Sequence, residues 1–154
     1  MENSDEQYMY MALQEACKAL DDGEVPIGAV IVHEGRVIGR GYNRIEALND
    51  ATAHAEIVAI GAASTSLETW RLNDCTLYVT LEPCLMCLGA ILQSRVGRVV
   101  YGASDNRFGA IETFQYKDQA AESYHRFPET VGGVMKEECK ALIQSFFKSI
   151  RKKD

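Results

Sequence analysis

The sequence lacks the long apolar runs that carry proteins into or across membranes. No stretch approaches the roughly 20 apolar residues that a membrane-spanning helix needs. The acidic start MENSDEQYMYMALQ has neither the basic beginning nor the apolar core of a secretory signal. We therefore expect no membrane partner and a cytoplasmic location. Repeats, low-complexity segments and linkers are absent too, so we expect one domain over residues 1–154.

Positive charge is scarce, with a net charge of −6 at pH 7 and a pI near 5.1. This balance argues against indiscriminate binding to nucleic acid or to anionic membranes. Basic residues do gather at the C-terminal end, at Lys140, Lys148, Arg151, Lys152 and Lys153. Two interpretations of this end stay open: contact with a polyanion, or a solvated last helical turn that complements the helix dipole.

Cysteine is present in an odd number, five, which together with the missing export signal argues against paired disulfides. Metal binding or catalysis is the better use for some of them. Cys17 and Cys139 fall on apolar helix stripes and Cys75 precedes a strand, so we expect these three to be buried as small apolar residues. Cys84 and Cys87 remain as candidates for chemistry.

The first third of the chain predicts a helix and a hairpin. Ser4 and Gln7 resemble a capping box, and an apolar stripe at helical spacing continues until Gly23 offers a stop. That stripe consists of Met9, Ala12, Leu13, Ala16 and Leu20. The apolar run 26–32 and the segment RVIGRGYN flank the turn residues EG, which predicts two antiparallel strands.

The rest of the chain alternates between helix and strand patterns. Residues 44–51 are expected to form a loop, with Thr52 as the cap of a small-residue helix over about residues 53–63. TLYVTL and RVVYGA have strand composition, EPCLMCLGAILQS predicts a helix starting at Pro83, and PETVGGV is a weaker strand. The last helix has an apolar stripe of Cys139, Leu142, Ile143, Phe146, Phe147 and Ile150. This interleaving predicts an α/β fold with a sheet layered between helices.

Two helix starts carry groups suited to a metal site. His54 and Glu56 lie in the first turn of one helix, and Cys84 and Cys87 lie one turn apart at the start of another. Two thiolates and an imidazole would leave one tetrahedral position of Zn²⁺ for water, as in catalytic zinc sites. Helix N-termini also lower thiol pKa values. Glu56, beside the ligands, could then move protons between water and a leaving amine.

Each half of this pattern has a less specific interpretation. The two cysteines alone could be a redox pair, and a lone histidine is more often structural than a ligand. A structural zinc would need a fourth ligand, for which Cys17, Cys75, Cys139, His33 and His125 are spare, although none has a paired spacing with the other three. The combination of both halves favours catalytic zinc.

The sequence resembles the bacterial tRNA adenosine deaminases, a family of zinc-dependent nucleobase deaminases with the signature His-x-Glu and Pro-Cys-x-x-Cys. The resemblance rests on TAHAEI, TLEPCLMCLGAI, EVPIGAVIV, GYNR, SRVGRVVYGASD and the late HR. It implies a three-layer α/β/α sandwich with a five-stranded mixed sheet, a homodimer, and conversion of the wobble adenosine of a tRNA anticodon to inosine.

The resemblance also implies roles for individual residues. His54, Cys84 and Cys87 would bind zinc, and Glu56 would be the proton shuttle. Substrate contacts would come from Asn43 to the base, Ile27 and Ala55 lining the pocket, Asp105 near a neighbouring ribose, and Arg107 at a phosphate. A carboxylate at Asp105 could accept a hydrogen bond from a 2′-OH. Without the resemblance, Asn43 could be a turn residue and Asp105 could cap a loop.

The sequence departs from the family in two places. Ala51 replaces a usual proline, which we expect to alter loop stiffness only. RFGAIETFQYKDQAAESYHRF lacks the usual Gly-Ser, and an exposed carboxylate at Glu112 should weaken polyanion binding. Phe108, Phe114 and Tyr116 could stack on a splayed base, although core positions are the first expectation. The alternatives are thus deamination of a free nucleobase or nucleoside by the same zinc site, and a zinc-stabilised interaction protein without catalysis.

Overall fold

The computed structural model describes residues 2–124 and 126–153, which form a layered α/β fold. In chain order the elements are α1 Glu2–Asp21, β1 Gly28–His33, β2 Arg36–Tyr42, α2 Ile45–Leu48, α3 Ala55–Leu67, β3 Cys75–Leu81, α4 Leu85–Gln93, β4 Arg98–Ala103, α5 Lys117–Tyr124, β5 Glu129–Gly132 and α6 Lys136–Lys153. In the described residues, no helix is both long enough and apolar enough to cross a membrane.

The sheet is mixed and has five strands in the order β2-β1-β3-β4-β5. β1 pairs antiparallel with β2 and β3, whereas β3–β4 and β4–β5 are parallel. Strands β2, β3 and β4 consequently run in the same direction, and the segments that follow them leave from one edge. Ligands of open α/β sheets bind at that carboxyl edge. The predicted mixed five-stranded sheet is confirmed.

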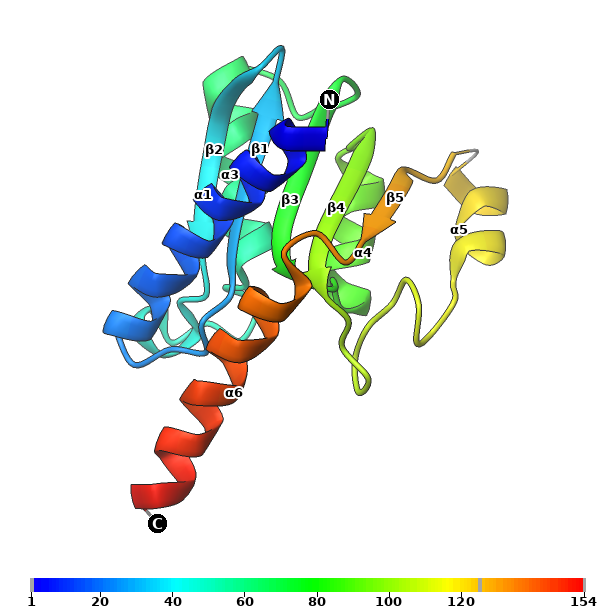
Figure 1. Ribbon diagram of the computed structural model, residues 1–154. Coiled ribbons are helices and arrows are strands. Elements are labelled where there is room, and N and C mark those ends of the chain that lie inside the picture. Colours follow the sequence, from blue (N-terminus) through cyan, green and yellow to red (C-terminus); the bar gives the residue numbers. More distant parts are fainter. Residues whose placement is uncertain (1, 125, 154) are drawn as a thin grey trace.

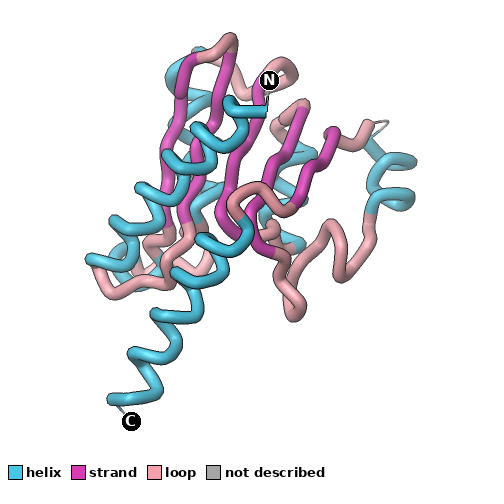
Figure 2. Tube along the Cα trace, viewed as in Figure 1, coloured by secondary structure: helices cyan, strands magenta, loops and turns pink. Residues whose placement is uncertain are grey.

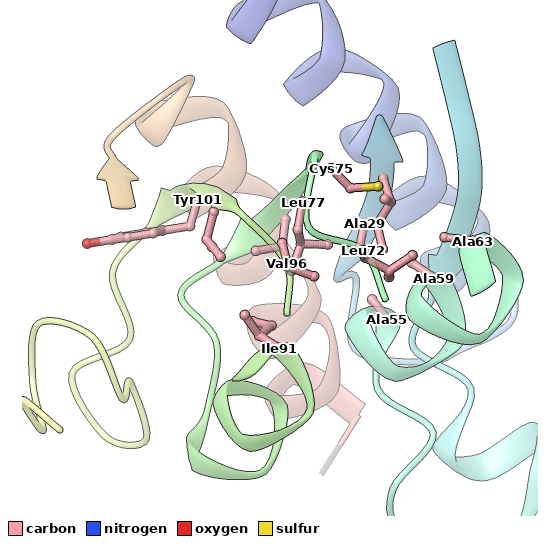
Figure 3. Close-up of a cluster of buried hydrophobic side chains, with 13 residues drawn as sticks. Ala29, Ala55, Ala59, Ala63, Leu72, Cys75, Leu77, Ile91, Val96 and Tyr101 are labelled. Atoms are coloured by element: carbon pink, nitrogen blue, oxygen red, sulfur yellow. The ribbon is translucent and has the colours of Figure 1, made fainter. Parts of the chain in front are cut away.

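Helices cover both faces of the sheet (Figure 1; Figure 2). Alternate residues of the central strands point to opposite sides. On one side Ala29, Ile31 and Leu77 pack with α3 and α4 through Ala59 and Ile91 (Figure 3). On the other side the core under α1 and α6 contains Met9, Ala12, Val30, Val32, Tyr78, Val100 and Cys139. The predicted α/β/α layering is therefore confirmed.

Two glycines bring α3 unusually close to β2. A Cβ atom at Gly39 would lie 2.5 Å from the carbonyl oxygen of Ala59, and one at Gly41 would lie 2.4 Å from that of Ala55. Alanines on the facing side of α3 complete this small-residue contact. The contact fixes the start of α3, where His54 and Glu56 lie, against the sheet.

Several predicted boundaries were wrong. Ser4 lies inside α1 rather than at its cap, and α3 begins at Ala55 with His54 as its N-cap, because the Thr52 hydroxyl bonds to Asp50. α4 starts at Leu85, two residues after Pro83. The short helix α2 occupies part of the expected loop 44–51, and α5 was not predicted, because neither helix has a buried residue to create an apolar pattern.

The cysteines outside the candidate site differ in burial. Cys75 and Cys139 are buried as expected. Cys17 is exposed, so its predicted burial was wrong. α1 buries Met9, Ala12 and Ala16, and the position after Ala16 is turned by about 100° toward solvent.

Candidate active site

His54, Cys84 and Cys87 converge from two helix starts. The Nδ1 atom of His54 lies 3.6 Å from the Sγ atom of Cys84 and 3.5 Å from that of Cys87. All three donor atoms lie within 4.8 Å of one another, and no other metal-binding group of three occurs in the described residues. Bonds of zinc to nitrogen and sulfur in a tetrahedron place such donors about 3.6 Å apart. The donor set and its spacing therefore fit a zinc ion.

The backbone explains why these side chains are free to bind a metal. His54 and Cys84 are the N-cap residues of α3 and α4, each with an extended backbone, and neither side chain makes a capping hydrogen bond. Both side chains point ahead of their helices instead. The partial positive charge of two helix N-termini favours thiolates at this point.

The three members of the cluster shift one another's pKa values. Hydrogen bonds from Cys87 and then His54 lower the pKa of the Cys84 thiol to about 4. The Cys84 thiolate in turn raises the pKa of Cys87, through their hydrogen bond, and that of His54. Cys84 is thus the group most ready to be a thiolate ligand.

Glu56 is a buried carboxyl group beside this cluster. It is only 4% exposed, and burial raises its pKa to about 7, with the Cys84 thiolate adding to the rise. A carboxyl group with a pKa near neutrality can accept a proton and give it back at working pH. Its environment therefore suits a general acid and base.

A pocket of about 770 Å³ opens at this point. His54, Glu56 and Cys84 line it, together with polar residues of the segment after β4. The apolar side chains of its wall are Val25, Ile27, Leu81, Leu85, Met86, Phe108, Phe114, Tyr116, Ile143 and Phe147. This size and mostly apolar lining are typical of small-molecule sites.

The structure brings most of the predicted substrate residues to this pocket. Ile27, Asp105 and Arg107 line it. Asn43 is buried, and its backbone N–H donates to the carbonyl of Ile27. Ala55 is buried. In the sequence it lies between His54 and Glu56, which both line the pocket.

Asp105 also shapes its own loop. One carboxylate oxygen accepts hydrogen bonds from the backbone N–H groups of Arg107 (3.0 Å) and Phe108 (3.2 Å). The loop-capping interpretation of Asp105 is therefore correct for that oxygen. The other carboxylate oxygen makes no hydrogen bond within the described residues, so a ligand could reach it.

Aromatic side chains surround the pocket mouth. Phe108 is 59% exposed and carries the guanidinium group of Arg107 at 5.0 Å from its ring centre. Phe114 is also exposed and stacks on Tyr116. The expected core positions were wrong for Phe108 and Phe114, because both lie in the irregular segment between β4 and α5, in the wall of the pocket.

Comparisons with known proteins give the family of the chain. The family model described as MafB19-like deaminase matches residues 3–151. The "tRNA-specific adenosine deaminase" of Bacillus subtilis is 48% identical over 97% of this chain and 92% of its own length. This chain belongs to the tRNA-specific adenosine deaminases.

Solved structures support the fold of this deaminase. A structure from studies of A-to-I editing by tRNA:A34 deaminases superposes with a TM-score of 0.84 and 44% identity, over 88% of this chain and 98% of the other. A guanine deaminase from Nitrosomonas europaea superposes with a TM-score of 0.77 at 25% identity, over 92% and 83% of the two chains. The fold thus also serves deamination of a free base.

Two carboxylates of the deaminase hold the pocket loop. Glu112 is exposed and accepts hydrogen bonds from the hydroxyl groups of Tyr101 and Ser104. Glu82 is buried and, within the described residues, accepts only from backbone N–H groups; it was not among the residues predicted from the sequence. Its only sequence signal is a glutamate directly after a buried strand. His125, a spare ligand in the sequence, lies outside the described residues.

Proposed function

We propose that this protein is a zinc-dependent hydrolase that converts adenosine to inosine at the wobble position of a tRNA anticodon. The observation that carries the proposal is the convergence of His54, Cys84 and Cys87 beside the buried Glu56, in the wall of one pocket. The names of the relatives support tRNA as the substrate. A tRNA substrate also fits a cytoplasmic enzyme.

His54, Cys84 and Cys87 would hold the zinc ion, which when bound lowers the pKa of a water molecule toward neutrality. Glu56 takes a proton from that water as its oxygen attacks C6 of adenine. Glu56 would pass this proton to N1 of the ring and carry the second proton, from the hydroxyl group now on C6, to the departing amino group, so that adenosine and water yield inosine and ammonia. Burial of Glu56 keeps its pKa near 7, which suits both transfers.

The proposal also assigns the residues that contact the substrate. Asn43 is a buried residue, and its side-chain amide would pair with the base. Ile27 and Ala55 would line the base, the latter through its backbone. The unpaired oxygen of Asp105 could accept a 2′-OH, which would favour RNA over DNA. Arg107 would meet a phosphate.

The proposal includes a homodimer, as the family resemblance implies. Size-exclusion chromatography with light scattering should give twice the 17.1 kDa mass of one chain. A monomer at working concentration would count against this part of the proposal.

A second candidate uses the same zinc site on a free nucleobase or nucleoside. The structural likeness to a guanine deaminase and the exposed charge of Glu112 favour it. To separate the two, ammonia release is measured with an anticodon stem-loop, guanine, cytosine and adenosine as parallel substrates. The proposal expects the stem-loop to be preferred by its kcat/KM; preference for a free base would move the assignment to the second candidate.

A further inference from the structure

Glu82 is a buried carboxylate that no proposed chemical step uses. It is 2% exposed, and one carboxylate oxygen accepts from the backbone N–H of Asp105 at 3.0 Å. The other oxygen accepts from Ile111 at 2.9 Å and from Glu112 at 2.6 Å. No lysine, arginine or histidine of the described residues forms an ion pair with it. A buried charge is therefore satisfied only while this loop stays in place.

The loop packs closely against this carboxylate. A Cβ atom at Gly109 would lie 2.3 to 2.5 Å from the carboxyl atoms of Glu82, so any larger residue there would have to displace this carboxylate. Gly109 also forms an isolated bridge with Cys84, and the N–H of Ala110 donates to the carbonyl of Pro83 at 2.9 Å. The loop is thus attached to three consecutive residues, the last of which is the candidate metal ligand Cys84.

This attachment connects the metal site to the substrate side of the pocket. Asp105, Arg107 and Phe108 lie on the attached loop and line the pocket. Glu82 lies two positions before Cys84. The place of this loop relative to the metal-binding helix start therefore depends on the hydrogen bonds to Glu82 together with the backbone contacts at Pro83 and Cys84.

We propose that Glu82 is a positioning residue that holds the loop of residues 105–112 against the metal-binding helix start and thereby sets the affinity for the substrate. The inference rests on the proposed function for its substrate. Glu82 itself does not touch the reacting atoms. Its effect is expected in KM rather than in kcat, because the ligands and Glu56 keep their places when the loop moves.

The test compares five variants of the full chain, among them Glu82→Ala alone. Glu82→Gln keeps the size of the side chain but replaces one acceptor oxygen by an NH₂ group that must face a backbone N–H. Gly109→Ala pushes on the same carboxylate from the loop side. Glu24→Gln is the matched control, because Glu24 is equally buried and accepts from the backbone N–H groups of Glu46 (3.0 Å) and Ala47 (2.8 Å) in α2, away from the loop of residues 105–112. Gly109→Ala is also made in a Glu82→Ala background.

Three quantities are measured: zinc per chain, hydrogen exchange at the amides of Asp105, Ile111 and Glu112, and the kinetics of inosine formation in an anticodon stem-loop. For Glu82→Gln and Gly109→Ala we expect full zinc content, exchange roughly 10-fold faster or more, and KM raised roughly 10-fold or more with kcat within about 3-fold. The control should change neither these amides nor KM. Gly109→Ala should add nothing when Glu82 is already Ala.

Two results would overturn the inference. Faster exchange with an unchanged KM would mean that the loop position does not set affinity. Loss of zinc with a lower kcat and an unchanged KM would make Glu82 a support for Cys84 alone. Failure of the proposed function has a different signature, because the wild-type protein would then make no inosine, and the exchange rates alone would decide whether Glu82 holds the loop.

Discussion

At the scale of single residues, the site depends on two N-cap positions whose side chains do not cap. His54 and Cys84 make no side-chain capping hydrogen bond, and the Nδ1 atom of His54 lies 3.6 Å from the Sγ atom of Cys84. Removing a ligand from such a cluster leaves two donors, too few for a tight zinc site. Substitution of a cysteine of the cluster should therefore weaken zinc binding far more than substitution of another cysteine of the chain.

Cys87→Ala should lower zinc affinity by more than about 100-fold. This loss exceeds the one typical of mutating residues that only hydrogen-bond to the metal ligands. Competition with a chelator of known affinity measures this change. The exposed Cys17 provides the control, because Cys17→Ala removes a thiol without touching the cluster. Equal zinc affinity of the two variants would rule out Cys87 as a ligand.

Phe108→Ala should raise KM for an anticodon stem-loop by roughly 10-fold, since one base stacked on an aromatic ring contributes about 1–3 kcal/mol. Phe108 lies at the pocket mouth and is available for such stacking. Tyr10→Ala is the comparison, because Tyr10 is a similarly exposed aromatic residue on α1. The stacking role is wrong if both variants have the KM of the wild type.

The metal cluster and Glu56 could be predicted because short spacings place them at helix starts. Glu82 could not, because its three donors lie 23 to 30 positions away and depend on how the loop after β4 folds back. The exposure of Phe108 and Phe114 was missed for the same reason. Apolar residues predict burial only where a regular element presents them to a partner.

At the scale of elements, α3 is held close to β2 by residues without bulk. Gly41→Ala would place a methyl group 2.4 Å from the carbonyl oxygen of Ala55, which belongs to the backbone and cannot move alone. We expect a loss of about 1–3 kcal/mol in the free energy of unfolding, as for other overpacked contacts. Urea denaturation measures it.

Gly61→Ala is the matched change on α3, because nothing lies within 4 Å of a Cβ atom there. It should be neutral or stabilise the protein by up to about 1 kcal/mol through helix propensity. A similar loss in both variants would refute the close-contact explanation.

Elements with a buried face were predictable, and elements without one were not. The apolar stripe of α1 and the strand patterns of β1, β3 and β4 each match an observed element. α2 and α5 bury no residue and had no such pattern. The predicted cap at Thr52 was wrong, because the Thr52 hydroxyl donates to Asp50 and His54 is the N-cap of α3.

At the scale of the whole molecule, an ion pair between two residues far apart in the sequence joins α1 to the sheet. Asp5 accepts from both terminal guanidinium nitrogens of Arg98 in β4, at 2.9 and 2.8 Å, and from the hydroxyl of Tyr78 at 2.8 Å. The hydrogen bonds from Arg98 hold the pKa of Asp5 below its ordinary value of 3.8. Its ionised form is therefore favoured in the folded state.

Asp5→Asn should lower the free energy of unfolding by about 1–2 kcal/mol at pH 7, because a charged hydrogen-bond network is lost. The folded-state pKa is depressed, so this stabilisation is complete above pH 3.8 and is lost as the pH falls through the folded pKa. The difference between wild type and variant should thus narrow below that pH. Urea denaturation at pH 7 and near pH 3.5 measures it, with the exposed Glu6→Gln as control; a constant difference would refute the ionic explanation.

The order of strands and the direction of the sheet decide where the site lies. Because β2, β3 and β4 run the same way, His54, Cys84 and Asp105 all follow strands that end at one edge. The class of fold could be predicted from alternating helix and strand patterns, and the family resemblance supplied the mixed sheet. The sequence pattern does not predict which loops meet above that edge. Their meeting depends on how segments far apart in the sequence pack in three dimensions.

The most direct measurement is mass spectrometry of an anticodon stem-loop with a wobble adenosine after incubation with zinc-loaded wild type and with Glu56→Ala. We predict inosine with the wild type and none with the variant, while both proteins contain the same amount of zinc. Inosine formed equally by both would contradict the role of Glu56. No inosine from the zinc-loaded wild type would contradict tRNA as the substrate.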